Sequence, residues 1–469
     1  MTFIALLNVH DVDTFNVVNV DDTNDCLVRG ELDRPGLFPH LEGLAAAARV
    51  FEPDFGLAEL PMSPGILVIR GPRQYGKSTW LEGRLRASAE ELGPGSALFV
   101  DAQELADGGA LRRQVRRTIG LFRPGAPVRR LFIDEITAVA GWETALKALV
   151  DRGDLRDVLV VTTGSRCTDL RRGVERLPGR RGRLDRTSWL FTPVPFAEFV
   201  RVCGRDFPPP REGEEGGAMA DDAVLAYLLA GGCPLALSEM AARGRLPEWT
   251  VEVVRDWIDG ELARSGRARA PLVQVMEVLT RSGGSPIGQT RLAREAGLAN
   301  NTVAAGYVEQ LADLMCVGIQ QAWDPARRVP VARRRAKYPF INTLAAVAWH
   351  PARPRTVEEL RARPAQEQGT WLEWLVAQEV WRRSAMEGDP FPERLLYWHS
   401  KHRELDFVLS SAGGTFVEVK RGRASPSEHA WFAPEHPAGR LLVVTRTPFR
   451  TDRVRGLTAR KLLLARDWG

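Results

Sequence analysis

One stretch of the sequence has the residue types and spacing that bind the phosphates of a nucleotide. Residues 71–79, "GPRQYGKST", contain the pattern G-x-x-x-x-G-K-[ST]. In this pattern the glycines let backbone N–H groups surround phosphate oxygens, the lysine contacts the β and γ phosphates, and the next hydroxyl binds Mg²⁺. We therefore expect Gly71, Gly76, Lys77, Ser78 and Thr79 to bind nucleotide, with Ser78 also a metal ligand.

Two acids further along the chain complete the chemistry that this motif needs. The stretch "RRLFIDEI" is an apolar run that ends in Asp134 and Glu135. We expect Asp134 to contribute to the metal and nucleotide site and Glu135 to polarise the attacking water. A glycine turn followed by a strand with a capped end is the alternative interpretation. The order of the two motifs favours ATP hydrolysis, with ATP and Mg²⁺ as cofactors.

A second group of charged residues lies near the end of the chain, inside two apolar runs. In residues 402–423, "HRELDFVLSSAGGTFVEVKRGR", Asp406 precedes Glu418, and Lys420 follows two positions later. The "SSAGG" between the runs is typical of a turn, so we expect a β-hairpin. Alternation along the second strand places Glu418 and Lys420 on one face. Two acids and a lysine that converge there either bind a divalent ion or neutralise one another.

The phosphate-binding motif needs a sheet to support it, and residues 65–200 have the pattern of one. Four apolar runs alternate there with helix-like spacers: "GILVIR", "SALFVD", "RRLFIDE" and "DVLVVTTGS". This alternation is typical of a parallel α/β sheet. Residues 204–222, rich in proline, glycine and acids, then predict an exposed linker.

Residues 288–317 have the pattern of a helix-turn-helix. Gly297 interrupts the helical periodicity, and Asn300 or Asn301 can cap the second helix. The basic residues 327–342, "RRVPVARRRAKYPFIN", would form a wing.

The charges of this segment predict how it would contact nucleic acid. From Asn301 to Leu314 the would-be recognition helix has no lysine or arginine, so we do not expect it to read base sequence. Four cations of the wing could hold a phosphate backbone: Arg333, Arg334, Arg335 and Lys337. DNA binding without sequence preference is one prediction, and an internal docking module is the other.

The composition of the chain excludes few classes of protein. The 469 residues require several domains, and the net charge of +5 weakly favours polyanionic partners. The five cysteines form no CxxC pair, so we expect reduced core thiols: Cys26, Cys167, Cys203, Cys233 and Cys316. The first residues lack a basic region before a short apolar run, which predicts a cytoplasmic protein without membrane segments. The sequence leaves open whether the chain forms a homo-oligomer.

At this point the chain resembles the AAA+ related ATPases of bacteria and archaea that carry a winged helix and a C-terminal nuclease-like domain of unknown function. The resemblance covers roughly residues 60–425 and depends on "GPRQYGKST", "LFIDEI" and "VVTTGSRCTDLRRGVERLPGRRGR". It implies a sensor role for Ser165 and a catalytic arginine at Arg180, although the arginines of 171–183 could equally be a solvated helix face. Asn342 stands where the family usually has an acid.

The C-terminal part looks like the core of the PD-(D/E)xK nuclease fold. A helix that contains Glu373, "GTWLEWLVAQEVWRR", and the strand "RLLYWHS" precede the hairpin, and the strand "GRLLVVTRT" follows it. The resemblance implies that Glu373, Asp406 and Glu418 hold Mg²⁺ while Lys420 orients or deprotonates water. A buried ion pair in a fold that no longer cuts is the alternative.

These observations predict an α/β multidomain protein. The expected parts are an N-terminal extension (1–60), a P-loop ATPase domain with a parallel sheet (61–205), a helical lid (206–265), a winged helix (266–350) and a restriction-nuclease-like domain (360–469). The predicted function is ATP hydrolysis coupled to a nuclease-like domain that acts on DNA. The alternative is a nucleotide-dependent switch or scaffold whose C-terminal domain only binds.

Overall fold

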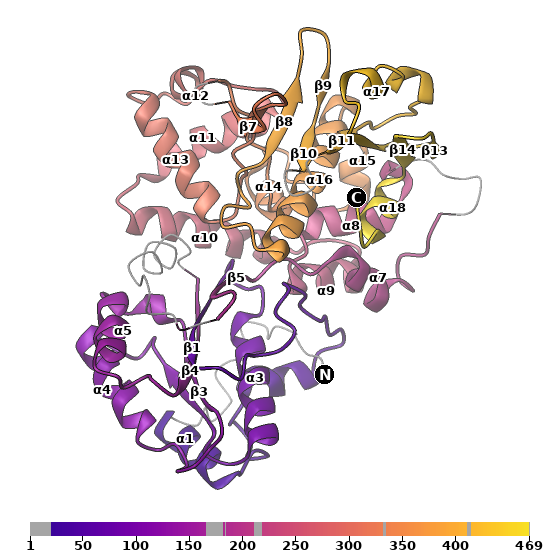
Figure 1. The fold of residues 1–469 in the computed structure, drawn as a ribbon. Helices are drawn as coiled ribbons and strands as arrows, with labels where there is room; N and C mark the ends of the chain where they lie inside the picture. The colour runs from indigo at the N-terminus through magenta and orange to yellow at the C-terminus, as the bar shows by residue number, and fades with distance from the viewer. Residues whose placement is uncertain are drawn as a thin grey trace. The chain divides into compact units, whose positions relative to one another are not determined.

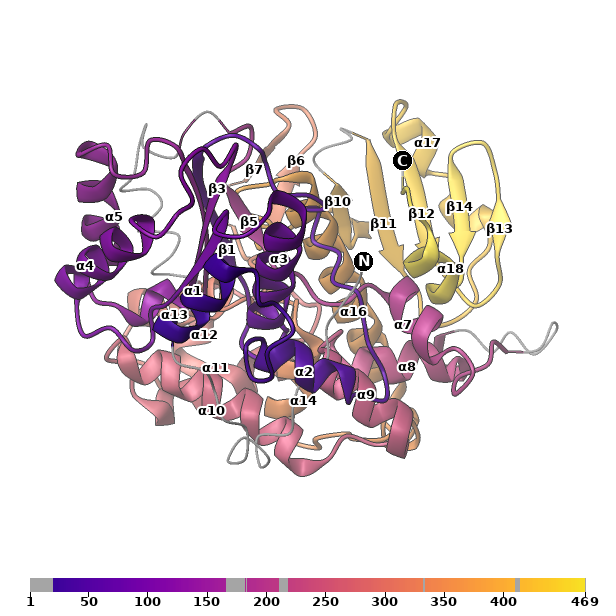
Figure 2. The same ribbon diagram turned by 90° about the horizontal axis from the view of Figure 1, so that it is seen from below.

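The computed structural model describes residues 20–165, 182, 184–210, 218–331, 334–409 and 414–468. The chain divides into two compact units, residues 1–194 and 195–469. Figures 1 and 2 show the elements of each unit in two views.

The N-terminal unit is built on a five-stranded parallel sheet. Its strand order is β2-β3-β4-β1-β5. The strands are β1 (Gly65–Arg70), β2 (Ala97–Asp101), β3 (Arg129–Asp134), β4 (Val158–Gly164) and β5 (Ser188–Leu190). The four strands expected from the apolar runs are confirmed as β1 to β4, and most of their residues are buried. The short strand β5 was not predicted.

Helices cover both faces of this sheet. Helix α3 (Lys77–Leu92) lies on one face, and α4 (Gly108–Ile119) and α5 (Trp142–Asp151) lie on the other (Figures 1 and 2). Helix α1 (Val20–Arg29) packs beside β2, where the Asn24 amide bonds both the N–H and the C=O of Phe99. Helix α2 (Pro39–Ala45) packs on α3. Residues 20–60 of the expected extension therefore belong to the same compact unit as the sheet.

The C-terminal unit begins with helices. They are α7 (Phe196–Cys203), α8 (Asp222–Ala230), α9 (Pro234–Arg243), α10 (Glu248–Arg264), α11 (Arg269–Ser282), α12 (Gln289–Glu295), α13 (Asn301–Asp313), α14 (Thr343–Trp349), α15 (Val357–Arg361) and α16 (Ala365–Glu387). The Asn300 side chain accepts a hydrogen bond from the N–H of Val303, which confirms the expected cap of α13. Asn342 caps α14 in the same way through the N–H of Ala345.

Two sheets complete the C-terminal unit, with strand orders β7-β6-β8-β9 and β10-β11-β12-β14-β13. The strands are β6 (Gln321–Asp324), β7 (Val329–Pro330), β8 (Leu396–His399), β9 (Glu404–Leu405), β10 (Phe407–Leu409), β11 (Thr415–Val419), β12 (Arg440–Val444), β13 (Phe449–Arg450) and β14 (Val454–Leu457). The helical turn Pro426–His429 and helix α17 (Phe432–Glu435) follow β11, and α18 (Ala459–Leu464) follows β14. Strands β10 and β11 pair antiparallel, so the expected hairpin is confirmed.

Four cysteines lie in the described residues, and all are buried thiols that form no disulfide there, as expected: Cys26, Cys203, Cys233 and Cys316. Cys167 lies outside the described residues. Among the helices that the structure describes, none combines the length and the apolar character required to cross a membrane.

Candidate functional site

The loop between β1 and α3 has the close packing that its glycines predict. Gly76 has φ +92°, a left-handed conformation that favours glycine. A Cβ on Gly71 would lie 2.7 Å from the Cβ of Phe191, so only glycine fits there without a shift. The Lys77 ammonium donates hydrogen bonds to the C=O groups of Gly71 (3.0 Å) and Pro72 (2.7 Å). The lysine that should contact phosphate therefore folds back over its own loop.

The two acids at the end of β3 have separate surroundings. One carboxylate oxygen of Asp134, Oδ1, accepts hydrogen bonds from the N–H of Glu135 (3.0 Å) and from the hydroxyl of Thr163. In the described part of the chain, no hydrogen bond to the other oxygen of Asp134 or to the Ser78 hydroxyl is seen. Hard oxygen donors of this kind suit Mg²⁺, so Ser78 and Asp134 fit the predicted metal.

The Glu135 carboxylate is held by the end of the neighbouring strand. Its Oε1 accepts hydrogen bonds from the hydroxyl of Ser165 (2.7 Å), the N–H of Ser165 (2.9 Å) and the hydroxyl of Thr137 (2.8 Å). Burial raises the pKa of Glu135, but the charge of Lys77 and these hydrogen bonds outweigh burial and lower the pKa below its ordinary value. Glu135 is therefore ionised and oriented, as a group that polarises water must be.

The structure also brings in residues that the motifs did not identify. Thr163 and Thr137 bond the two acids, and the Arg73 guanidinium donates to the Ser165 hydroxyl at 3.3 Å. The polar run "TTGS" at the end of β4 was the available signal for Thr163. Thr79 is buried at the start of α3. Arg180 lies outside the described residues, so its catalytic role stays a prediction.

In the C-terminal unit, one lysine contacts three acids. The Lys337 ammonium lies 2.6 Å from Glu404 Oε1, and 3.5 Å from both Glu373 Oε1 and Asp406 Oδ1. The Lys337 side chain is only 1% exposed, which corrects the expectation that it lies on a basic wing. Sequence reasoning missed this contact because Lys337 precedes the hairpin by a long stretch of chain.

The same cluster perturbs the protonation of its acids. Burial, followed by the charge of Asp406, raises the pKa of Glu373 to about 7, although Lys337 opposes the rise. Burial also raises the pKa of Asp406, against the charge of Lys337 and a 2.7 Å hydrogen bond from the N–H of Val419. Burial lowers the pKa of Lys337, but the surrounding acids raise it by more. The cation is therefore permanently charged.

Glu418 has a separate pair of cationic neighbours. Its carboxylate lies 2.6 Å from the Lys420 ammonium and 2.7 Å from His429 Nε2. The other ring nitrogen of His429 lies 3.1 Å from the C=O of Ser425. The hydrogen bond that His429 donates to the Glu418 carboxylate raises the pKa of His429, which favours the imidazolium.

The metal set predicted for the hairpin is not assembled. Glu373 and Asp406 face Lys337, whereas Glu418 faces Lys420 and His429. Across the described ranges, no three histidine, cysteine, aspartate or glutamate side chains are grouped so that they could hold a metal ion. The physical reason is that cations of the chain already lie beside each acid.

Comparison with known proteins supports the phosphate-binding site of the N-terminal unit. Residues 63–200 match the family model described as AAA domain. This part of the chain, with its parallel sheet and phosphate loop, is similar to AAA domains. No curated protein matches the chain.

The solved structures to which the chain is similar have low sequence identity to it. One is the Walker-type ATPase of Pyrococcus abyssi (15% identity, TM-score 0.40, 61% of this chain and 90% of that chain). Another is the Aeropyrum pernix ORC1 protein in complex with DNA (16% identity, TM-score 0.31, 72% of this chain and 94% of that chain). A third is the Thermotoga maritima RuvB Holliday junction branch migration motor (16% identity, TM-score 0.28, 57% of this chain and 85% of that chain).

Proposed function

We propose that the N-terminal unit binds ATP with Mg²⁺ and hydrolyses it. The observation that carries this proposal is the ionised Glu135, which Ser165 orients at 2.7 Å and Lys77 attracts. On nucleotide binding, Lys77 would exchange the C=O groups of Gly71 and Pro72 for phosphate oxygens.

The remaining residues of the site have complementary roles in this proposal. Ser78 and Asp134 would hold Mg²⁺, which neutralises charge on the phosphates when bound. Glu135 has a second oxygen, Oε2, with which to accept a proton from water while Oε1 stays bonded to Ser165. Ser165 keeps the carboxylate in place and connects it to Arg73.

The test is the steady-state ATPase rate of the full chain with Glu135→Gln. The variant keeps the shape but cannot polarise water, so we expect ATP binding close to wild type and turnover reduced at least 100-fold. Thr118→Val, a buried change on α4 away from the loop, is the control for folding. Equal turnover by wild type and Glu135→Gln would remove Glu135 from the mechanism.

For the C-terminal unit we propose a binding role without DNA cleavage, controlled by the state of the ATPase domain. Support comes from Lys337, which compensates Glu373 and Asp406 internally where the nuclease interpretation needs free metal ligands. DNA cleavage, with the roles predicted for Glu418 and Lys420, is therefore the second candidate function.

Plasmid nicking separates the two candidates. Wild type with Mn²⁺ or Mg²⁺ should leave supercoiled plasmid intact. Nicking that is abolished by Asp406→Ala would establish a nuclease and overturn the binding-only proposal.

A further inference from the structure

Three arginines of the C-terminal sheet lie on one face, beside a pocket that is also lined by the acids Asp452 and Asp467. Leu442 of β12 pairs with Arg455 of β14, and Arg455 pairs with Arg450 of β13. Arg440 precedes Leu442 by two positions, so strand alternation places Arg440, Arg450 and Arg455 on the same face. All three side chains are exposed. Among the described residues, none makes a hydrogen bond or ion pair with these three guanidinium groups.

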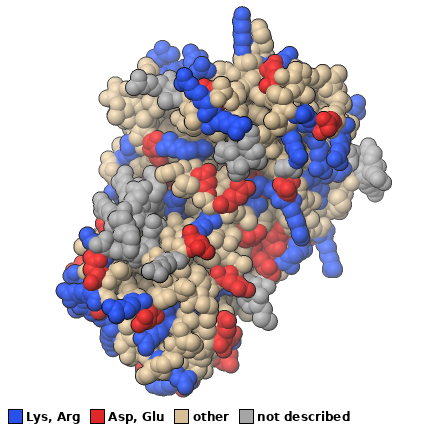
Figure 3. Space-filling model, in the orientation of Figure 1, with Lys and Arg blue, Asp and Glu red and all other residues tan. Residues whose placement is uncertain are grey.

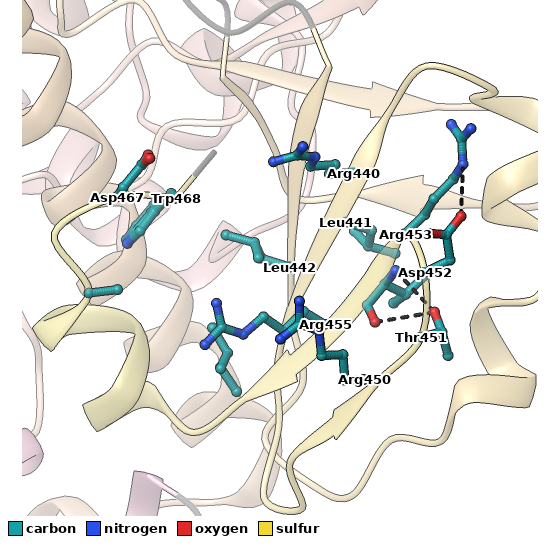
Figure 4. Close-up of a pocket in the computed structure, with 13 residues that line it drawn as sticks. Arg440, Leu441, Leu442, Arg450, Thr451, Asp452, Arg453, Arg455, Asp467 and Trp468 are labelled. Carbon is teal, nitrogen blue, oxygen red and sulfur yellow. Dashed lines mark hydrogen bonds and ion pairs between the residues drawn. The ribbon is translucent and has the colours of Figure 1, made fainter.

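This face borders a pocket of about 240 Å³ (Figure 4). Leu442, Ala465 and Trp468 contribute apolar walls. In Figure 4, Arg453, which also lines the pocket, lies beside Asp452, with which it forms an ion pair at 3.7 Å. Figure 3 shows lysine and arginine side chains gathered over the region of β13, β14 and α18.

The backbone that carries the arginines is firmly held. The turn between β13 and β14 is closed by hydrogen bonds between Thr451 and Val454, including 2.8 Å from the N–H of Thr451 to the C=O of Val454. The ring of Phe449 lies so close to Gly456 that a Cβ there would be 2.4 Å from it. The other face of the sheet, with Leu441, Val443 and Val454, is part of the hydrophobic core.

The arrangement has an energetic cost that a bound anion would offset. Arg450 and Arg455 are directly opposite across antiparallel strands, and like charges in such pairs are destabilising. Planar guanidinium groups match phosphate oxygens through paired hydrogen bonds. The arginines lie on three successive strands and form a slanted row, about 10 Å across the sheet at the usual strand spacing, because Arg440 lies two residues before the position opposite Arg455. A row of this length suits consecutive phosphates of a polymer better than one small anion.

We propose that Arg440, Arg450 and Arg455 form a binding site for the phosphodiester backbone of nucleic acid. This inference rests on the proposed binding role of the C-terminal unit and gives the class of its ligand. It relocates the expected nucleic-acid contact from the wing to the sheet face that carries the pocket. Side chains that contact phosphates do not read bases, so the site binds without sequence preference.

The test uses the full chain and fluorescence anisotropy of a fluorescein-labelled 30-base-pair DNA duplex, with single-stranded DNA and RNA of equal length as further arms. The triple variant Arg440→Gln, Arg450→Gln and Arg455→Gln removes the site. Loss of about three phosphate contacts should reduce the slope of log K against log salt by about 3 for duplex DNA and about 2 for single strands. We expect Kd at 100 mM salt to rise at least tenfold.

The matched control loses the same charge from the predicted wing: Arg333→Gln, Arg334→Gln and Arg335→Gln. It should bind nearly as wild type. Loss of binding in this control but not in the pocket variant would overturn the proposal, as would tighter wild-type binding to polyglutamate than to any of the nucleic acids. The pocket variant should keep wild-type ATP turnover. Loss of turnover by Glu135→Gln tests the ATPase proposal independently, and plasmid nicking tests the binding-only role.

Discussion

Lys337 should be essential for the stability of the C-terminal unit at neutral pH and less important in acid. The perturbation is Lys337→Met, which keeps most of the side-chain volume but removes the charge. In wild type the ammonium contacts Glu373, Glu404 and Asp406, and its side chain is 1% exposed. Without it, the carboxylates of Glu373 and Asp406, which are only 14% and 17% exposed, lose their compensating charge. Breaking a buried ion pair in this way costs on the order of 3–5 kcal/mol.

The pH dependence follows from the pKa of Glu373. Burial and Asp406 raise this pKa from 4.5 to about 7, so the folded protein binds more protons than the unfolded chain between those values. Stability contributed by the protonated carboxyl is complete below pH 4.5 and is lost as pH rises to about 7. The loss is on the order of 3 kcal/mol, at about 1.4 kcal/mol per pH unit.

In Lys337→Met, this pH-dependent loss of stability extends to higher pH. Lys337 lowers the pKa values of Glu373 and Asp406, so its removal raises both further. The difference in unfolding free energy between wild type and Lys337→Met should therefore be largest at pH 8. At pH 5 it should be at least 1 kcal/mol smaller, because protonation already neutralises Glu373.

The assay is urea unfolding of the full chain at pH 5 and pH 8, followed by tryptophan fluorescence. Of the thirteen tryptophans, all but Trp80, Trp142 and Trp189 lie in residues 195–469, so the signal reports mainly on this unit. Lys401→Met, at an exposed lysine of the same unit, is the control. The double variant Lys337→Met with Glu373→Gln should recover part of the loss.

A loss below about 1 kcal/mol at pH 8 would refute the reasoning, because an exposed ion pair costs no more than that. An equal loss at both pH values would also refute it, since the effect would then come from packing and not from charge.

Three further predictions concern single residues. Lys77→Ala should lose most ATP affinity in an equilibrium binding assay, because the phosphates would then contact only backbone dipoles; tight binding would contradict the assignment of the phosphate loop. Asn342→Ala should lower the unfolding free energy by about 1 kcal/mol, because Asn342 caps α14; an unchanged unfolding free energy would exclude the cap. Lys420→Met should cost less than about 1 kcal/mol, because its side chain is 44% exposed; a loss as large as that of Lys337→Met would assign Glu418 to a fully buried pair.

Much of the N-terminal unit could be predicted from the sequence. The phosphate loop is contiguous in the chain, so Gly71–Ser78 show their spacing without any knowledge of the fold. The apolar runs predicted β1 to β4 because strands buried on both faces require nearly continuous apolar sequence. The run that ends at Asp134 and Glu135 likewise placed both acids at a strand end.

The structure alone decided which distant side chains meet. Ser165 lies beside Glu135 because β4 pairs with β3, and Lys337 reaches Asp406 because the segment before α14 lies against the hairpin. Lys337 and Lys420 are the same kind of residue in similarly basic stretches, yet one is buried among three acids and the other is half exposed. The row formed by Arg440, Arg450 and Arg455 depends on the register of three strands. Local sequence records side-chain type and periodicity, whereas burial and charge pairing depend on strand order and on packing between segments far apart in the chain.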